Sequence, residues 1–211
     1  MNEKQLRERI VLWGRSLFNR NFTVGSSGNI SVRCEASFLV TPTNSCLGML
    51  EAETLSKLDA DWVHVSGDKP TKELPLHRAF YDGRPQTQAV VHLHSTFATA
   101  LSCLEDTDAK DAIPPITPYV VMRVGQVPIL PYTPPGSQDV APLVRAVAPK
   151  HAAVLLANHG PVVTGSSLDA AVYAAEELEE TAKLVFLTKG HAVRHLDADQ
   201  VALLNARFTL R

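Results

Sequence analysis

The sequence predicts an α/β protein: one layered domain spanning residues 1–211, with a mixed, mainly antiparallel central sheet flanked by helices. Short runs of β-forming residues outnumber the helical segments that could connect parallel strands. No Gly-x-Gly-x-x-Gly motif follows any of these runs, so a dinucleotide-binding Rossmann domain is not expected. The length of 211 residues and the apolar content of 45% allow a substantial core.

The first half of the chain alternates between helix and strand patterns. An opening helix is predicted by apolar residues that recur at intervals of three and four: Leu6, Ile10, Trp13 and Leu17. After a Gly/Ser/Asn-rich loop, β-forming residues predict strands at 30–34, 37–41 and 62–66. Pro75 suits the first turn of another helix. The run AVVHLH, residues 89–94, predicts a further strand, and Ser95 can cap the helix after it.

The second half opens with a proline-rich segment, residues 113–135, which excludes one long helix and predicts loop plus a short strand near 127–130. A helix is expected to open at Ser137, and a buried strand, AAVLLAN, is expected to turn at NHGP into a short strand. In the last long helix Ser166 and Asp169 resemble a capping box, Gly190 ends the helix, and the acidic run EELEE is expected to be a solvated face. The tail, residues 197–211, is expected to pack as a short helix.

Charge and cysteine content exclude several classes of protein. The formal net charge is −2 and no basic block occurs, so neither nucleic acid nor an anionic membrane surface is expected as a partner. Cys34, Cys46 and Cys103 form no Cys-x-x-Cys pattern, which is typical of a reducing compartment. The N-terminus lacks a signal-peptide core, and no run has the length of a membrane span. We therefore expect a soluble cytoplasmic protein.

Two histidines stand at the end of the AVVHLH run. His92 and His94 share one face of a strand, where two imidazoles can bind one metal ion, although a pair of ordinary histidines is an equal alternative. His159 ends a second buried strand just before a turn, and Glu73 begins a helix. Three histidines and one carboxylate would complete a tetrahedral Zn²⁺ site, but Glu73 taken alone fits a solvated residue at a helix start better. The remaining histidines have no comparable context.

Three polar loops offer the groups that a phosphate monoester needs. They contain backbone N–H groups, hydroxyls, amides and one cation, at Gly28–Asn29, Thr43–Asn44 and Thr71–Lys72. Ordinary turn chemistry is the alternative explanation for each loop taken alone.

Five motifs in order carry a resemblance over nearly the whole chain: GSSGNISVR, LVTPTN, PTKE, VVHLHS and LLANHGPVV. The sequence resembles the class II aldolases of the L-fuculose-phosphate aldolase and L-ribulose-5-phosphate 4-epimerase type. The resemblance implies a class II aldolase-like α/β/α fold and a divalent metal, usually zinc, on His92, His94 and His159. It implies that Glu73 is both a metal ligand of the empty site and an acid/base, and that the three polar loops bind substrate phosphate. It also implies a homotetramer with active sites between subunits, to which Tyr119 of the neighbouring subunit contributes a proton donor.

Several stretches are closer to one branch of that family. TPTNSCLG, LSKLDADWVHVSGDKPTKE and YVVMRVG resemble the 3-oxo-tetronate 4-phosphate decarboxylases. The aldolase branch tends to carry a small hydroxyl residue directly before the Glu, where this chain has Lys72, whose cation can bind a substrate carboxylate or supplement phosphate binding. The resemblance implies zinc-dependent decarboxylation of a phosphorylated sugar acid, through an enediolate, to dihydroxyacetone phosphate and CO2. The alternatives are a sugar-phosphate aldolase or epimerase and a non-catalytic assembly module such as the adducin head region, which lacks the metal-binding histidines.

Overall fold

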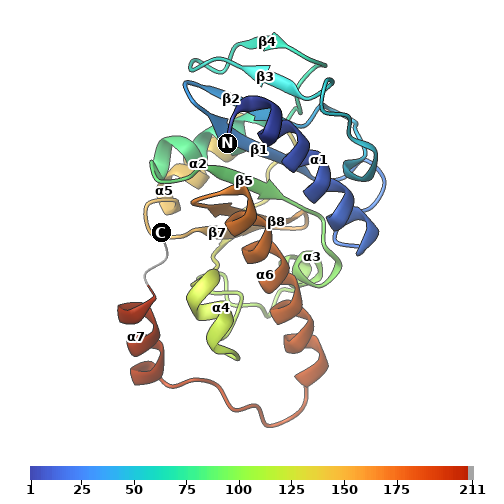
Figure 1. Cartoon of the computed structure of the whole chain (residues 1–211). Coiled ribbons are helices and arrows are strands. Elements are labelled where there is room, and N and C mark those ends of the chain that lie inside the picture. The colour runs from blue at the N-terminus through green and yellow to red at the C-terminus, as the bar shows by residue number, and fades with distance from the viewer. Residues whose placement is uncertain (209–211) are drawn as a thin grey trace.

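The structure is a computed structural model that describes residues 1–208, and it is an α/β fold with helices on both faces of one sheet (Figure 1). The strands are β1 Asn29–Cys34, β2 Ser37–Val40, β3 Ser56–Leu58, β4 His64–Ser66, β5 Ala89–His92, β6 Ile129–Leu130, β7 Ala153–Leu156 and β8 Gly160–Gly165. The α-helices are α1 Glu3–Asn19, α2 Leu74–Gly83, α3 Thr96–Cys103, α4 Pro118–Arg123, α5 Val140–Val147, α6 Leu168–Thr188 and α7 Ala198–Arg207, and a short 3-10 helix η1 covers Leu47–Met49.

The sheet confirms the predicted mixed, mainly antiparallel class. Its eight strands follow the order β4-β3-β2-β1-β5-β8-β7-β6. Every neighbouring pair is antiparallel except β6 and β7, which are parallel. β5 therefore lies at the centre, between β1 and β8, and its end is surrounded by the ends of neighbouring strands.

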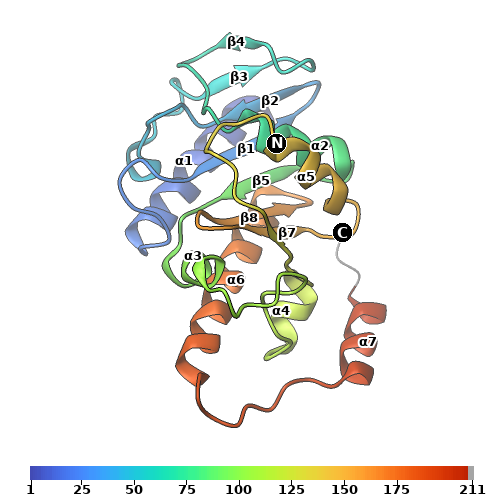
Figure 2. The same cartoon turned by 180° about the vertical axis from the view of Figure 1, so that it is seen from behind.

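Helices cover the two faces of the sheet and enclose a core on each. α1 and α6 lie on one face, in front in Figure 1, whereas α2 and α5 lie on the other, in front in Figure 2. Side chains of successive strand residues point to opposite faces, so Val91 of β5 packs with α1 and α6 while Val90 packs with α2 and α5. Both valines are fully buried. The centre of the sheet, where β5 ends, is thus fixed by packing on both sides.

The predicted elements of the first half are confirmed with shifted ends. Leu6, Ile10 and Leu17 are buried on α1, as their spacing predicts. The strand expected at 62–66 begins at His64, and β3 was not predicted because it has only three residues, Ser-Lys-Leu, with no alternating pattern to detect. The strand expected at 89–94 ends at His92, so His94 lies beyond it.

The proline-rich segment contains a helix that the sequence prediction missed. The short strand is confirmed as β6, but residues 118–123, predicted as loop, form α4. Pro118 stands in the first turn, where no N–H is needed, and the Thr117 side chain accepts a hydrogen bond from the N–H of Val120 at 3.3 Å. The helix expected to open at Ser137 begins only at Val140.

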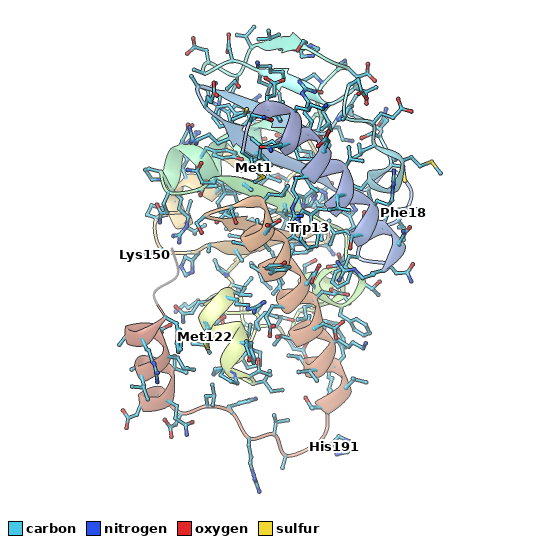
Figure 3. The ribbon with its side chains drawn as sticks, viewed as in Figure 1. Met1, Trp13, Phe18, Met122, Lys150 and His191 are labelled. Atoms are coloured by element: carbon cyan, nitrogen blue, oxygen red, sulfur yellow. The ribbon has the colours of Figure 1, made fainter. Side chains whose placement is uncertain are left out.

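The start of α6 differs from the predicted capping box. Ser167, not Ser166, is the N-cap, and its side chain accepts a hydrogen bond from the N–H of Ala170. The Asp169 carboxylate instead accepts hydrogen bonds from Arg9 and from the indole N–H of Trp13, which lies between α1 and α6 (Figure 3). The sequence pattern failed because the partners of Asp169 come from a distant helix.

The acidic run in α6 is not wholly a solvated face. Glu179 is buried, and its two carboxylate oxygens accept hydrogen bonds of 2.8 Å from the N–H groups of Phe97 and Ala98, in the first turn of α3. Ser95 occupies the N-cap position of α3 but makes no capping hydrogen bond, so that expectation was wrong. A carboxylate from another helix satisfies the helix start in its place.

The C-terminal tail forms the predicted short helix as α7, which has no fully buried residue, and residues 209–211 of that prediction lie outside the described part. All three cysteines are free. Among residues 1–208, no helix combines the length and apolar character needed to cross a membrane.

Candidate active site

The three predicted histidines meet at the end of β5. His92 is the last residue of β5, His94 follows two positions later, and His159 lies in the tight turn between β7 and β8. Because β8 pairs with β5, that turn returns beside His92. The Nε2 atom of His92 lies 3.3 Å from Nε2 of His159 and 3.2 Å from Nε2 of His94.

The Glu73 carboxylate lies beside two of the three histidines. Its Oε2 lies 3.4 Å from Nε2 of His92, and its Oε1 lies 3.5 Å from Nε2 of His159. Four ligands bound tetrahedrally to one Zn²⁺ at about 2.1 Å lie about 3.4 Å from one another. The 3.2 and 3.3 Å distances between the imidazole nitrogens therefore suit binding to one metal ion, and the three histidines form a group that could hold one.

A backbone hydrogen bond sets the tautomer of His92. Its Nδ1 lies 2.9 Å from the carbonyl oxygen of Pro161, so Nδ1 carries the hydrogen and donates it. The lone pair of the ring is then on Nε2, which points at the cluster. This is the arrangement by which proteins orient a metal-binding imidazole.

Burial keeps the cluster in the protonation state that a metal needs. Burial lowers the pKa of His92 to about 4, against the opposing charge of Glu73, so the ring is neutral at physiological pH. Burial also lowers the pKa of His94 and of His159, and the positive charge of Lys72 adds to both shifts. Burial alone would raise the pKa of Glu73, but His92, the Asn29 hydrogen bond and His159 together bring it below its ordinary value. The site thus combines neutral imidazoles with a carboxylate.

Local structure places Glu73 and the β1 end against the cluster. Glu73 is the N-cap of α2, where its carbonyl accepts the first hydrogen bonds of the helix. Glu73 is 6% exposed, and its carboxylate accepts a 2.7 Å hydrogen bond from the Asn29 amide. Gly28 has φ +81°, and a Cβ there would lie 2.9 Å from the carbonyl oxygen of His92. Only glycine allows this approach of the backbone.

Two of the three predicted phosphate loops lie side by side. The N–H of Thr43 donates to the carbonyl of Lys69, and the N–H of Thr71 donates to the carbonyl of Thr41. Thr71 is buried and its hydroxyl accepts from the N–H of Glu73, whereas Lys72 and Asn44 are exposed. In the remaining loop, Gly28–Asn29, the Asn29 side chain donates a hydrogen bond to Glu73. The phosphate-binding role of all three loops remains a prediction.

Tyr119 lies on the surface of α4 and is 55% exposed. In the described chain the Arg123 guanidinium lies over its ring, 5.5 Å from the ring centroid. Its predicted action in a neighbouring subunit remains a prediction.

The sequence analysis assigns no role to His77, one of the histidines without a comparable context. His77 is fully buried on α2, and its Nε2 lies 2.5 Å from Oδ1 of Asn29. The available signal was its spacing of four residues from Glu73, which places both on one face of a helix start.

This chain belongs to the class II aldolase family, because residues 8–186 match the family described as "Class II Aldolase and Adducin N-terminal domain". A 3-oxo-tetronate 4-phosphate decarboxylase of Pectobacterium atrosepticum is 50% identical over 205 residues, which cover 97% of this chain and 94% of that protein. An L-fuculose phosphate aldolase of Haemophilus influenzae is 31% identical over 212 residues, covering 99% of this chain and 95% of that protein. The crystal structure of YgbL from Klebsiella pneumoniae is similar with a TM-score of 0.94 and 51% identity, covering 97% of this chain and 99% of that one.

Proposed function

We propose that this chain, acting as a single domain, decarboxylates a 3-oxo-tetronate 4-phosphate to dihydroxyacetone phosphate and CO2. The observation that carries the proposal is the 50% identity with a 3-oxo-tetronate 4-phosphate decarboxylase over 97% of the chain. The cluster of three histidines and Glu73 supports it, because such a set suits a metal-dependent lyase.

We propose Zn²⁺ as the metal, held by His92, His94 and His159, with Glu73 as a fourth ligand when no substrate is bound. Imidazole and carboxylate are common zinc ligands, and an exchangeable carboxylate opens a position for substrate. The bound metal would supply a Lewis acid for the carbon–carbon cleavage.

The substrate chemistry needs one proton at carbon. The bond between the carboxylate carbon and C2 breaks, CO2 leaves, and the electron pair becomes the C2–C3 double bond of an enediolate. Protonation of C2 then gives dihydroxyacetone phosphate. Glu73 and Tyr119 are the groups that we assign to this proton transfer, Glu73 within the cluster and Tyr119 from a neighbouring subunit.

Binding of the substrate's two anionic ends is assigned to the loops around Glu73. The loops at Gly28–Asn29, Thr43–Asn44 and Thr71–Lys72 supply N–H groups and hydroxyls for the phosphate. Lys72 is exposed and directly precedes Glu73 in the chain, and its positive charge contributes to the lowered pKa of His94 and of His159. We assign Lys72 to the substrate carboxylate, which a sugar-phosphate aldolase substrate lacks.

The assembly that we propose is a homotetramer with active sites between subunits. The support is the 55% exposure of Tyr119 on α4, which leaves its side chain accessible to a second chain. A second chain would bring this hydroxyl to the cluster.

A sugar-phosphate aldolase is the second candidate, favoured by the 31% identity with an L-fuculose phosphate aldolase. A non-catalytic module is disfavoured because the histidine cluster is intact. The two enzymes differ in product. Purified protein is incubated with 3-oxo-tetronate 4-phosphate or with L-fuculose 1-phosphate, and CO2, aldehyde and dihydroxyacetone phosphate are measured. We expect CO2 from 3-oxo-tetronate 4-phosphate and no aldehyde from L-fuculose 1-phosphate. Release of aldehyde from L-fuculose 1-phosphate, with no CO2 from 3-oxo-tetronate 4-phosphate, would identify the protein as an aldolase.

A further inference from the structure

We propose that His77 is a positioning residue that fixes the orientation of the Asn29 side-chain amide, so that Asn29 always presents its NH2 group to the active site. His77 acts on the site through Asn29. The effect on turnover rests on the proposed function, whereas the effect on the amide and on metal affinity does not.

The donor and the acceptor of each hydrogen bond in this network can be assigned in turn, starting from the Glu73 carboxylate. Oε2 of Glu73 can only accept, so the Asn29 atom 2.7 Å away is the NH2 nitrogen. The Asn29 oxygen then faces Nε2 of His77 at 2.5 Å, so Nε2 must carry the hydrogen. Nδ1 of His77 is left with a lone pair and accepts from the Ser31 hydroxyl at 2.7 Å. Ser31 in turn accepts from the Tyr81 hydroxyl at 3.1 Å.

Burial prevents water from replacing a member of this chain. His77 and Ser31 have no exposed surface, Tyr81 is 4% exposed and Asn29 is 5% exposed. A flipped Asn29 amide would place its oxygen against the Glu73 carboxylate, and its NH2 would meet the ring N–H of His77 unless the His77 proton moved to Nδ1 and reversed the hydrogen bond with Ser31. The first contact would set two buried acceptors against each other, and the second would require His77 and Ser31 to exchange donor and acceptor roles; an unsatisfied buried group is costly in a protein interior.

The fixed amide determines what the site can bind beside the histidines. Glu73 lies 3.4 Å from His92 and 3.5 Å from His159, and the Asn29 NH2 holds it there. When the carboxylate moves, the same NH2 group remains aimed at the site and can donate only to an oxygen that accepts. His77 therefore makes the part of the site beside the Asn29 NH2 group selective for an anionic or carbonyl oxygen. A phosphorylated sugar acid provides such oxygens.

Two substitutions at His77 separate this role from simple packing. In His77→Gln the terminal NH2 can replace the ring N–H and donate to Asn29. In His77→Asn the shorter side chain can reach Ser31 only. Thr164→Val is the matched control, because it removes a buried 2.9 Å hydrogen bond from β8 to the carbonyl oxygen of Ala152, the residue before β7, and involves no residue of the cluster.

The measurements are the Zn²⁺ dissociation constant of metal-stripped protein, by competition with a chromogenic chelator, and kcat and KM for CO2 release. Loss of a residue that orients a metal site typically costs about 10–100-fold in affinity or activity. We expect His77→Asn to weaken Zn²⁺ binding and lower kcat in this range, His77→Gln to recover most of both, and Thr164→Val to change neither.

Wild-type zinc affinity in His77→Asn would overturn the proposal, and so would a His77→Gln protein as impaired as His77→Asn. If the wild-type protein released no CO2 while the zinc affinities followed the expected order, the proposed function would fail and the role of His77 would stand.

Discussion

Glu179 offers a quantitative test of how the structure holds α3 beside the cluster. Both of its carboxylate oxygens accept hydrogen bonds of 2.8 Å, from the N–H groups of Phe97 and Ala98. Glu179→Ala would leave both N–H groups without a partner. An orphaned buried N–H costs about 1–3 kcal/mol, and water can partly replace the contact at the less buried Phe97, so we expect a loss of about 2–4 kcal/mol.

The assay is equilibrium urea unfolding followed by circular dichroism, at one protein concentration because assembly contributes to stability. Glu180→Ala is the matched control, since that side chain is 61% exposed and its nearest cation, on Lys183, is 3.9 Å away. We expect the control to stay within about 0.5 kcal/mol of wild type. If Glu179→Ala were no less stable than Glu180→Ala, the reasoning about the α3 start would be refuted.

Three further outcomes are expected. Co-expression of Glu73→Gln and Tyr119→Phe chains should restore part of the activity that each lacks alone; no restoration would place both residues in one subunit. Lys72→Met should raise KM for the sugar acid by about tenfold or more, as loss of a charged hydrogen bond predicts, and an unchanged KM would remove Lys72 from carboxylate binding. Burial lowers the pKa of His77 to about 3 and of His92 to about 4, from an ordinary value of 6.5. The unfolded chain therefore binds more protons below pH 6.5, and the metal-free protein should lose unfolding free energy as pH falls from about 6.5 towards 4; a flat unfolding free energy there would contradict the burial of these neutral rings.

The sequence predicted the features that depend on local pattern. The apolar spacing of α1 and the β-forming runs around β5 and β7 depend on burial along one segment, which periodicity detects. The convergence of His92, His94 and His159 was predicted from strand ends and a family resemblance, and the sheet order brings them together.

The features that were missed depend on partners from distant segments. Glu179 looked like a member of a solvated acidic face, and only the packing of α6 on α3 shows that it caps another helix. Asp169 was expected to cap its own helix, but Arg9 and Trp13 bind it. His77 has an unremarkable local sequence, and its role emerges only when β1 and α2 lie together. Propensity and spacing carry no information on such contacts.

The most direct test of the account measures turnover of 3-oxo-tetronate 4-phosphate by protein stripped of metal with a chelator and then titrated with Zn²⁺. We expect no dihydroxyacetone phosphate from the stripped protein and full recovery at one Zn²⁺ per chain, with neither binding nor recovery in His159→Ala. Undiminished turnover by the stripped protein, or by His159→Ala, would contradict a reaction that depends on a metal held by the three histidines.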